Sequence, residues 1–166
     1  LNYEYDSKGN LIDNDYATFN YDNKNRLKTV TKDNKALTYF YDDLHRITET
    51  SYDGNSVKYG YDDNSNVIKI TYPGELEVDY TYDAKDRLKT VEDWNGAITT
   101  YNYLDDDRLE NMLYPNGVLT EYSYDDAGRM IGMVTHLNGD TIAGYTYELD
   151  LIGNHLQENK NEPLDR

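Results

Sequence analysis

The chain has 166 residues and a net charge of −16, from 32 acidic and 16 basic side chains. This acidity argues against nucleic acid and against insertion into or binding to a membrane, because phosphates and anionic lipids are bound largely through Lys and Arg. The chain has no cysteine, which excludes disulfides and thiolate metal sites, and no apolar run approaches the roughly 18 residues of a membrane span.

Tyrosine dominates the aromatic residues, with 19 copies. An aromatic-x-Tyr triplet recurs along the chain, and the second tyrosines lie 16, 20, 20, 21, 21, 21 and 23 residues apart. A nearly fixed period of this kind indicates a repeat protein. The eight triplets, in chain order, are Tyr3/Tyr5, Phe19/Tyr21, Tyr39/Tyr41, Tyr59/Tyr61, Tyr80/Tyr82, Tyr101/Tyr103, Tyr122/Tyr124 and Tyr145/Tyr147.

Most triplets are followed by the same short run. Asp comes directly after the second tyrosine, Arg or Asn stands five residues after it, and an aliphatic residue or Met follows at the sixth position. Leu104 and Glu148 stand where Asp is expected, and the last copy is two residues longer. We expect the following residues to be structural repeat residues: Tyr21, Asp22, Arg26, Tyr41, Asp42, Arg46, Tyr61, Asp62, Tyr82, Asp83, Arg87, Tyr103, Arg108, Tyr124, Asp125 and Arg129.

The Tyr-x-Tyr alternation predicts half-buried strands, since successive side chains of a strand point to opposite faces. Residues 57–61 illustrate such a strand, and the Val-, Ile- and Thr-rich residues 67–72 are typical of its partner. Asn-Gly and Asp-Gly pairs between strands favour type I′ turns, in which both central residues have positive φ. We therefore expect one β-hairpin per repeat, with turns near 53–54, 73–74, 95–96, 116–117 and 138–139.

One spacing does not fit a regular strand. The aliphatic residue at the sixth position and an apolar residue at the ninth, such as Val67 and Ile70, are three residues apart. A regular strand would point them to opposite faces. Either a β-bulge lies between them, or the first of the two packs under the turn.

Eight hairpins in tandem predict an all-β fold, in which antiparallel hairpin repeats form one curled, spiralling sheet, because wide sheets twist and an isolated hairpin is marginally stable. The repeats are expected to occupy residues 1–156, and residues 157–166 are expected to form a polar tail that lies outside the sheet or is loosely packed. Because the chain begins without Met, we expect it to be a piece of a longer protein.

The runs YDNKNRLKTV, YDDLHRITET, YDAKDRLKTV and YDDAGRMIGM closely resemble the Rhs/YD (tyrosine-aspartate) repeat, whose pattern is roughly Tyr-Asp-x-x-Gly-Arg-Leu. This family includes bacterial Rhs and wall-associated toxins, shell subunits of Tc toxins, and teneurins. The resemblance implies a secreted or cell-surface parent protein whose repeats wall off a hollow shell. Its partners would be other segments of that shell and an encapsulated C-terminal toxin or effector domain. The glycine of the pattern is kept only at Gly9, Gly128 and Gly153.

The recurring Asp has two interpretations. It can close a turn by accepting backbone N–H bonds and pair with the Arg four residues on, whereas Arg108 must find another acid because Leu104 replaces its partner. Alternatively, the oxygen-rich runs 62–66 and 105–107 could bind calcium, although Val67 stands where an EF-hand loop needs Gly. We favour the turn.

The tyrosines also have two interpretations, a cross-strand ladder or a platform on which sugar rings stack. The platform leads to an alternative function, a cell-surface module that binds carbohydrate or a partner protein. No metal-binding His spacing, nucleophile elbow or phosphate loop appears in the sequence. We therefore expect a structural scaffold with no catalytic residue, no metal site and no cofactor.

Overall fold

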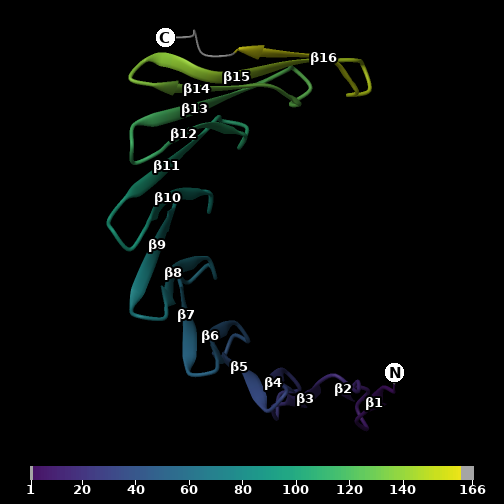
Figure 1. Cartoon of the computed structure of the whole chain (residues 1–166). Coiled ribbons are helices and arrows are strands. Elements are labelled where there is room, and N and C mark those ends of the chain that lie inside the picture. The colour runs from purple at the N-terminus through teal and green to yellow at the C-terminus, as the bar shows by residue number, and fades with distance from the viewer. Residues whose placement is uncertain (1, 162–166) are drawn as a thin grey trace. The chain divides into compact units, whose positions relative to one another are not determined.

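The computed structural model describes residues 2–161, and every regular element in them is a strand. The strands lie in the sheet in the order of the chain, from β1 to β16 (Figure 1). The predicted all-β architecture of tandem antiparallel hairpins is therefore confirmed. The chain divides into two compact units, and the boundary between them falls between Asp79 and Tyr80, inside β9.

The strands up to this boundary are β1 (Glu4–Tyr5), β2 (Leu11–Asp13), β3 (Thr18–Tyr21), β4 (Leu27–Lys32), β5 (Lys35–Tyr41), β6 (Ile47–Tyr52), β7 (Asn55–Tyr61), β8 (Val67–Tyr72) and the first part of β9 (Leu76–Tyr82). The second unit holds the rest of β9 and then β10 (Leu88–Glu92), β11 (Ile98–Tyr103), β12 (Leu109–Leu113), β13 (Val118–Tyr124), β14 (Met130–Leu137), β15 (Asp140–Leu149) and β16 (His155–Asn161).

The two faces of the sheet differ in the first unit. Tyr59 lies opposite Ile70, and Ile70 lies opposite Val78. Lys69, beside Ile70 in the strand, instead forms an ion pair with Glu77 at 2.6 Å. Because neighbouring strand residues alternate between faces, the aromatic and aliphatic side chains gather on one face and the charged ones on the other. Val78 is 7% exposed, but a single-layer sheet encloses little, and no described side chain is fully buried.

The second unit has the same two-faced arrangement. Tyr122 lies opposite Met133, and Met133 lies opposite Tyr145. Thr120 on the same face is 6% exposed and shares a hydrogen bond of 3.2 Å with Thr135. Tyrosine rings and aliphatic side chains thus form rows across the strands, as the period of two predicts.

A β-bulge explains the spacing of three residues. Tyr61 pairs with Val67 and Gly60 pairs with Lys69, so Ile68 is an extra residue and Val67 shares a face with Ile70. The bulge interpretation is therefore correct. The same shift occurs at the pairs Tyr5–Leu11, Tyr21–Leu27, Tyr41–Ile47, Tyr103–Leu109, Tyr124–Met130 and Leu149–His155.

All five predicted turns lie between strands, but they are not of one type. The turns at 53–54 and 138–139 have positive φ at both central residues, as type I′ requires. At 95–96 and 116–117 only the glycine has positive φ, so the expectation of type I′ is wrong there. Asp93 gives the reason at 95–96: its carboxylate accepts the N–H groups of Asn95 and Ala97, which stabilises a longer turn.

The chain stays in the sheet beyond the last predicted repeat. Strand β16 pairs antiparallel with β15, and Tyr145 and Tyr147 lie opposite Lys160 and Glu158. The alternative that the polar tail lies outside the sheet is therefore wrong for residues 157–161. The alternative of a loosely packed tail is not contradicted, since residues 157–160 are all exposed. Polar side chains do not prevent pairing here, because the ladder is made by backbone N–H and C=O groups. Residues 162–166 of the predicted tail lie outside the described residues.

Candidate functional site

The turn that follows the second tyrosine of each of the first seven triplets, and Leu149 in the last repeat, has the same backbone hydrogen bonds. In the third repeat, Asp42 N donates to Arg46 O at 3.0 Å and His45 N donates to Asp42 O at 3.2 Å. One Asp42 carboxylate oxygen accepts the Arg46 N–H at 2.9 Å. The same two backbone bonds close the turns that begin at Asp6, Asp22, Asp62, Asp83, Leu104, Asp125 and Asp150.

The fourth residue of this turn always lies in the left-handed region. Where the sequence has no glycine there, φ is still 59–71°, at Asn25, His45, Ser65, Asp86 and Asp107. The turns with Gly9, Gly128 and Gly153 have φ of 86°, 79° and 93°. Loss of the glycine therefore leaves the turn type unchanged.

All four expected Asp–Arg pairs are formed. The shortest nitrogen-to-oxygen distances are 2.7 Å for Asp22–Arg26, 2.7 Å for Asp42–Arg46, 2.6 Å for Asp83–Arg87 and 2.6 Å for Asp125–Arg129. Where Asn replaces Arg, its amide donates to the same carboxylate, at 2.8 Å for Asp6–Asn10, 3.0 Å for Asp62–Asn66 and 2.8 Å for Asp150–Asn154. As expected, Arg108 has another acid as its partner, Asp106.

Hydrogen bonding makes these aspartates stronger acids than usual. The Arg87 side chain donates to Asp83 and lowers the pKa of Asp83 from 3.8 to about 2. Hydrogen bonds from Arg129 lower the pKa of Asp125 in the same way. The carboxylates are therefore ionised over the whole neutral and mildly acidic range.

Each of the five arginines within residues 2–161 also reaches into the next repeat. Arg46 Nη1 donates to the backbone oxygen of Asp62 at 3.1 Å, and its guanidinium carbon lies 4.5 Å from the centre of the Tyr61 ring. Equivalent bonds run from Arg26 to Asp42, from Arg87 to Leu104, from Arg108 to Asp125 and from Arg129 to Asp150. The stacking recurs for Arg26 on Tyr41, Arg87 on Tyr103 and Arg108 on Tyr124, at 4.4–4.6 Å.

The stacked tyrosine returns a hydrogen bond to the repeat that supplied the arginine. Tyr61 Oη donates to Ile47 O at 2.7 Å, and Ile47 directly follows Arg46 in the sequence. The equivalent bonds join Tyr41 to Leu27, Tyr103 to Leu88 and Tyr124 to Leu109. Tyr21 makes the same bond to Leu11, although Asn10 stands there in place of the arginine. We call this set, with Asp42, Arg46 and Tyr61 as its type example, the inter-repeat latch.

The last repeat corrects the sequence alignment. Leu149, rather than Tyr147, occupies the second position, because it pairs with His155 beside the bulge and precedes the turn that Asp150 closes. Taking Glu148 as the replaced Asp was therefore wrong, since β15 is a longer strand. The spacing Asp150-x-x-Gly153-Asn154 matches the other turns and could have revealed this. Within the described residues, Arg129 accordingly stacks on no tyrosine ring, and its one hydrogen bond to the next repeat is the bond to Asp150 O.

The oxygen-rich runs are engaged in hydrogen bonds within the protein. Asp62 accepts both the backbone and the side-chain N–H of Asn66. Asp107 pairs with Lys85 and with Arg87, each at 2.7 Å. Within residues 2–161, no group of three or more His, Asp or Glu residues is placed to hold a metal ion.

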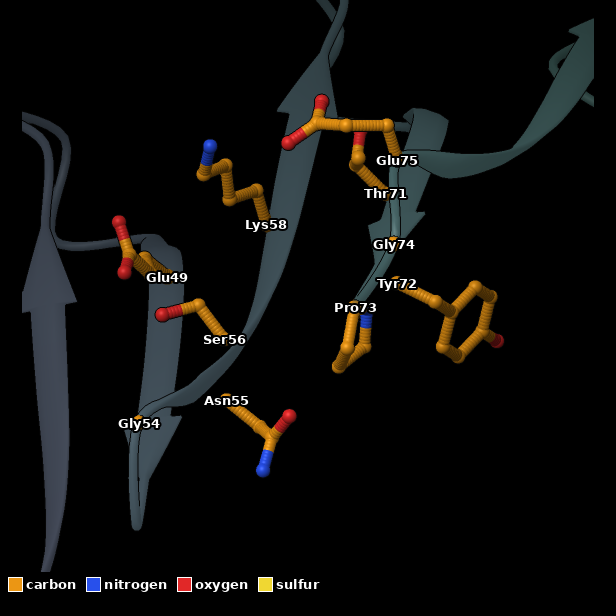
Figure 2. A pocket seen from close by; sticks show the side chains of 10 residues that line it. All are labelled: Glu49, Gly54, Asn55, Ser56, Lys58, Thr71, Tyr72, Pro73, Gly74 and Glu75. Carbon is orange, nitrogen blue, oxygen red and sulfur yellow. The ribbon is translucent and has the colours of Figure 1, made fainter.

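A hollow of about 490 Å³ opens in the first unit between the turns at 53–54 and 73–75. Figure 2 shows Lys58 on its wall between Glu49 on one side and Thr71 and Glu75 on the other. Glu49 faces Lys58 across β6 and β7, and Lys58 faces Thr71 across β7 and β8. The hollow is open and its lining is polar. The described residues contain no helix that is long and apolar enough to cross a membrane.

Residues 46–150 match the teneurin YD-shell family. Among solved structures, the fold is similar to TcdB2-TccC3 without its hypervariable C-terminal region, with a TM-score of 0.80 and 12% sequence identity. That match covers 96% of this chain but only 10% of the longer chain. The Tc holotoxin pore of Photorhabdus luminescens matches at a TM-score of 0.44 and 15% identity, over 96% of this chain and 12% of that one. No curated protein matches the sequence.

Proposed function

Because the chain belongs to the teneurin YD-shell family, we propose that it is a structural scaffold without catalytic activity, a segment of the wall of a larger shell. The inter-repeat latch carries this proposal. A single-layer sheet has no second layer to pack against, so its stability must come from contacts between neighbouring repeats. The latch provides such a contact between Arg46 and the next repeat through a stacked Tyr61 ring and two hydrogen bonds, while the ion pair with Asp42 holds the arginine within its own turn.

The latch also suits a wall of variable length. Each of these arginines pairs with an aspartate of its own turn and with groups of the following repeat, so a further repeat can be added without changing the earlier contacts. We propose that further segments of the same shell continue the wall in a secreted or cell-surface parent protein. In that protein the shell would enclose a C-terminal toxin or effector domain. The comparisons favour a shell over the alternative module that binds carbohydrate or a partner protein.

Limited proteolysis of the full-length parent protein tests the proposal. The C-terminal domain should resist protease while the wall is intact. Changing the four paired arginines to Ala (Arg26, Arg46, Arg87 and Arg129) should open the wall and expose that domain. Rapid cleavage of the C-terminal domain in the wild-type protein would contradict encapsulation.

A matched control removes the same charge without touching a latch. Lys28, Lys32, Lys58 and Lys89 form no ion pair within the described part of the chain. Changing these four lysines to Ala should leave the C-terminal domain protected. Equal exposure in both variants would show that net charge, and not the latch, controls the opening.

A further inference from the structure

Three Asn-Gly pairs lie in turns of the second unit, at 95–96, 116–117 and 138–139. An Asn followed by Gly is chemically labile, because the glycine nitrogen can attack the Asn side-chain carbonyl with no side chain in the way. The attack needs a free nitrogen and a turn that can change its backbone angles. The three pairs differ in the first requirement.

The glycine nitrogen is engaged in two of the three turns. Gly96 N donates to Asp93 O at 2.9 Å, and Gly117 N donates to Tyr114 O at 2.9 Å. In the third turn, Gly139 N makes no hydrogen bond to any described residue. A Cβ placed on Gly139 would meet no atom within 4 Å, and Asn138 is exposed.

We propose that Asn138 is a site of spontaneous covalent modification. The Gly139 nitrogen bonds to Cγ of Asn138, and the side-chain amide leaves as ammonia with the proton from Gly139 N. The resulting five-membered succinimide is then opened by water, which breaks one of its two C–N bonds. The products are Asp or isoaspartate at position 138. Water is the only co-reactant, and no electrons are transferred.

The product would change one hairpin locally. Asn138 and Gly139 line a hollow of about 460 Å³ together with His136 and Glu121, whose side chains lie 3.1 Å apart. A carboxylate at position 138 adds negative charge beside this pair. Isoaspartate also lengthens the backbone of a two-residue turn that joins Leu137 to Asp140. The β14–β15 turn, on the opposite rim of the sheet from the latches, would loosen with age independently of the shell role.

Peptide mass spectrometry of the full chain, after incubation in mildly alkaline buffer, measures the reaction at each pair. Asn138 should convert first. A hydrogen bond that must be broken before attack should make Asn95 and Asn116 slower by roughly two- to tenfold. Asn138→Gln should abolish conversion at this position, because attack would then have to form a larger ring.

A second variant makes the test independent of position. Asp53 and Gly54 form the same turn type, with φ of 52° and 81°, and Gly54 N also has no partner among the described residues. Asp53→Asn should therefore create a new site that converts at a rate comparable with Asn138. Conversion of Asn95 or Asn116 as fast as Asn138, or an inert Asp53→Asn turn, would overturn the proposal.

Discussion

Removal of the Tyr61 hydroxyl tests the latch at a single bond. Tyr61→Phe keeps the ring and its stacking with Arg46 but removes the hydrogen bond to Ile47 O, which is 2.7 Å long. Partial burial raises the pKa of Tyr61, so the hydroxyl is a donor throughout the accessible pH range. Loss of one such bond should lower the free energy of unfolding by about 0.5–1.5 kcal/mol. For a chain of this size that corresponds to a fall in Tm of roughly 1–6 °C.

Tyr59→Phe is the matched control. Tyr59 lies two residues away on the same face of β7, and its hydroxyl has no hydrogen bond within residues 2–161. Thermal unfolding followed by circular dichroism should therefore show a clear fall in Tm for Tyr61→Phe and almost none for Tyr59→Phe. Urea titration of the same variants gives the free-energy difference directly.

The neighbouring joint gives a second measurement. In the preceding latch, Tyr41 Oη donates to Leu27 O at 2.7 Å. Tyr41 lies in β5 and Tyr61 in β7, so the two residues are two strand spacings, or roughly 10 Å, apart. At that separation, the effects of Tyr41→Phe and Tyr61→Phe should add. An equal loss from Tyr59→Phe and Tyr61→Phe, or no loss from either, would refute the latch as a source of stability.

Three further predictions follow from the same turns. Arg46→Lys should lower Tm, because an ammonium group cannot bind Asp42, stack on Tyr61 and reach the next turn at once. Lys58→Arg is the control, and an equal shift of Tm in both variants would contradict this prediction. Because the pKa of Asp83 is lowered to about 2, its contribution to stability is complete above pH 3.8 and is lost as the pH falls towards 2. In acid titrations, the difference in stability between wild type and Asp83→Asn should be largest above pH 3.8 and shrink as the pH falls through this interval; a difference that does not change with pH would contradict this. Gly128→Ala places a side chain at φ 79° and should cost about 1–2 kcal/mol in urea unfolding; an unchanged midpoint would show that the turn adapts.

The strands and the Asp–Arg pairs could be predicted because both depend on local spacing. Alternation with period two fixes which face Tyr59 and Tyr61 share. An Asp that accepts the N–H of the residue four positions on brings its carboxylate to that residue's side chain, as at Asp42 and Arg46. Neither step requires knowledge of which strands are neighbours.

The contacts between repeats were not predicted, because they depend on how far one turn lies from the next. Arg46 meets Tyr61 and Asp62 only because consecutive repeats pair as adjacent hairpins with a shared bulge. The last repeat shows the opposite difficulty. Strand β15 is two residues longer, so Leu149 lies in the position expected of Tyr147. The sequence period alone does not show whether two extra residues lengthen the strand or the turn.

The sixth repeat shows which part of the turn is essential. Leu104 has no carboxylate, yet Leu104 N still donates to Arg108 O, and Asp107 still has φ of 71°. Arg108 turns to Asp106 for its ion pair but still stacks on Tyr124 at 4.6 Å. The backbone of the turn and the reach of the arginine are therefore kept when the aspartate is lost. Within the described residues, Arg129 keeps its aspartate but has no stacked tyrosine, and Arg108 keeps its tyrosine but takes another acid. The hydrogen bond from the arginine to the backbone oxygen that opens the next turn is made in both cases, as it is by Arg26, Arg46 and Arg87, and is therefore the constant element of the contact between repeats.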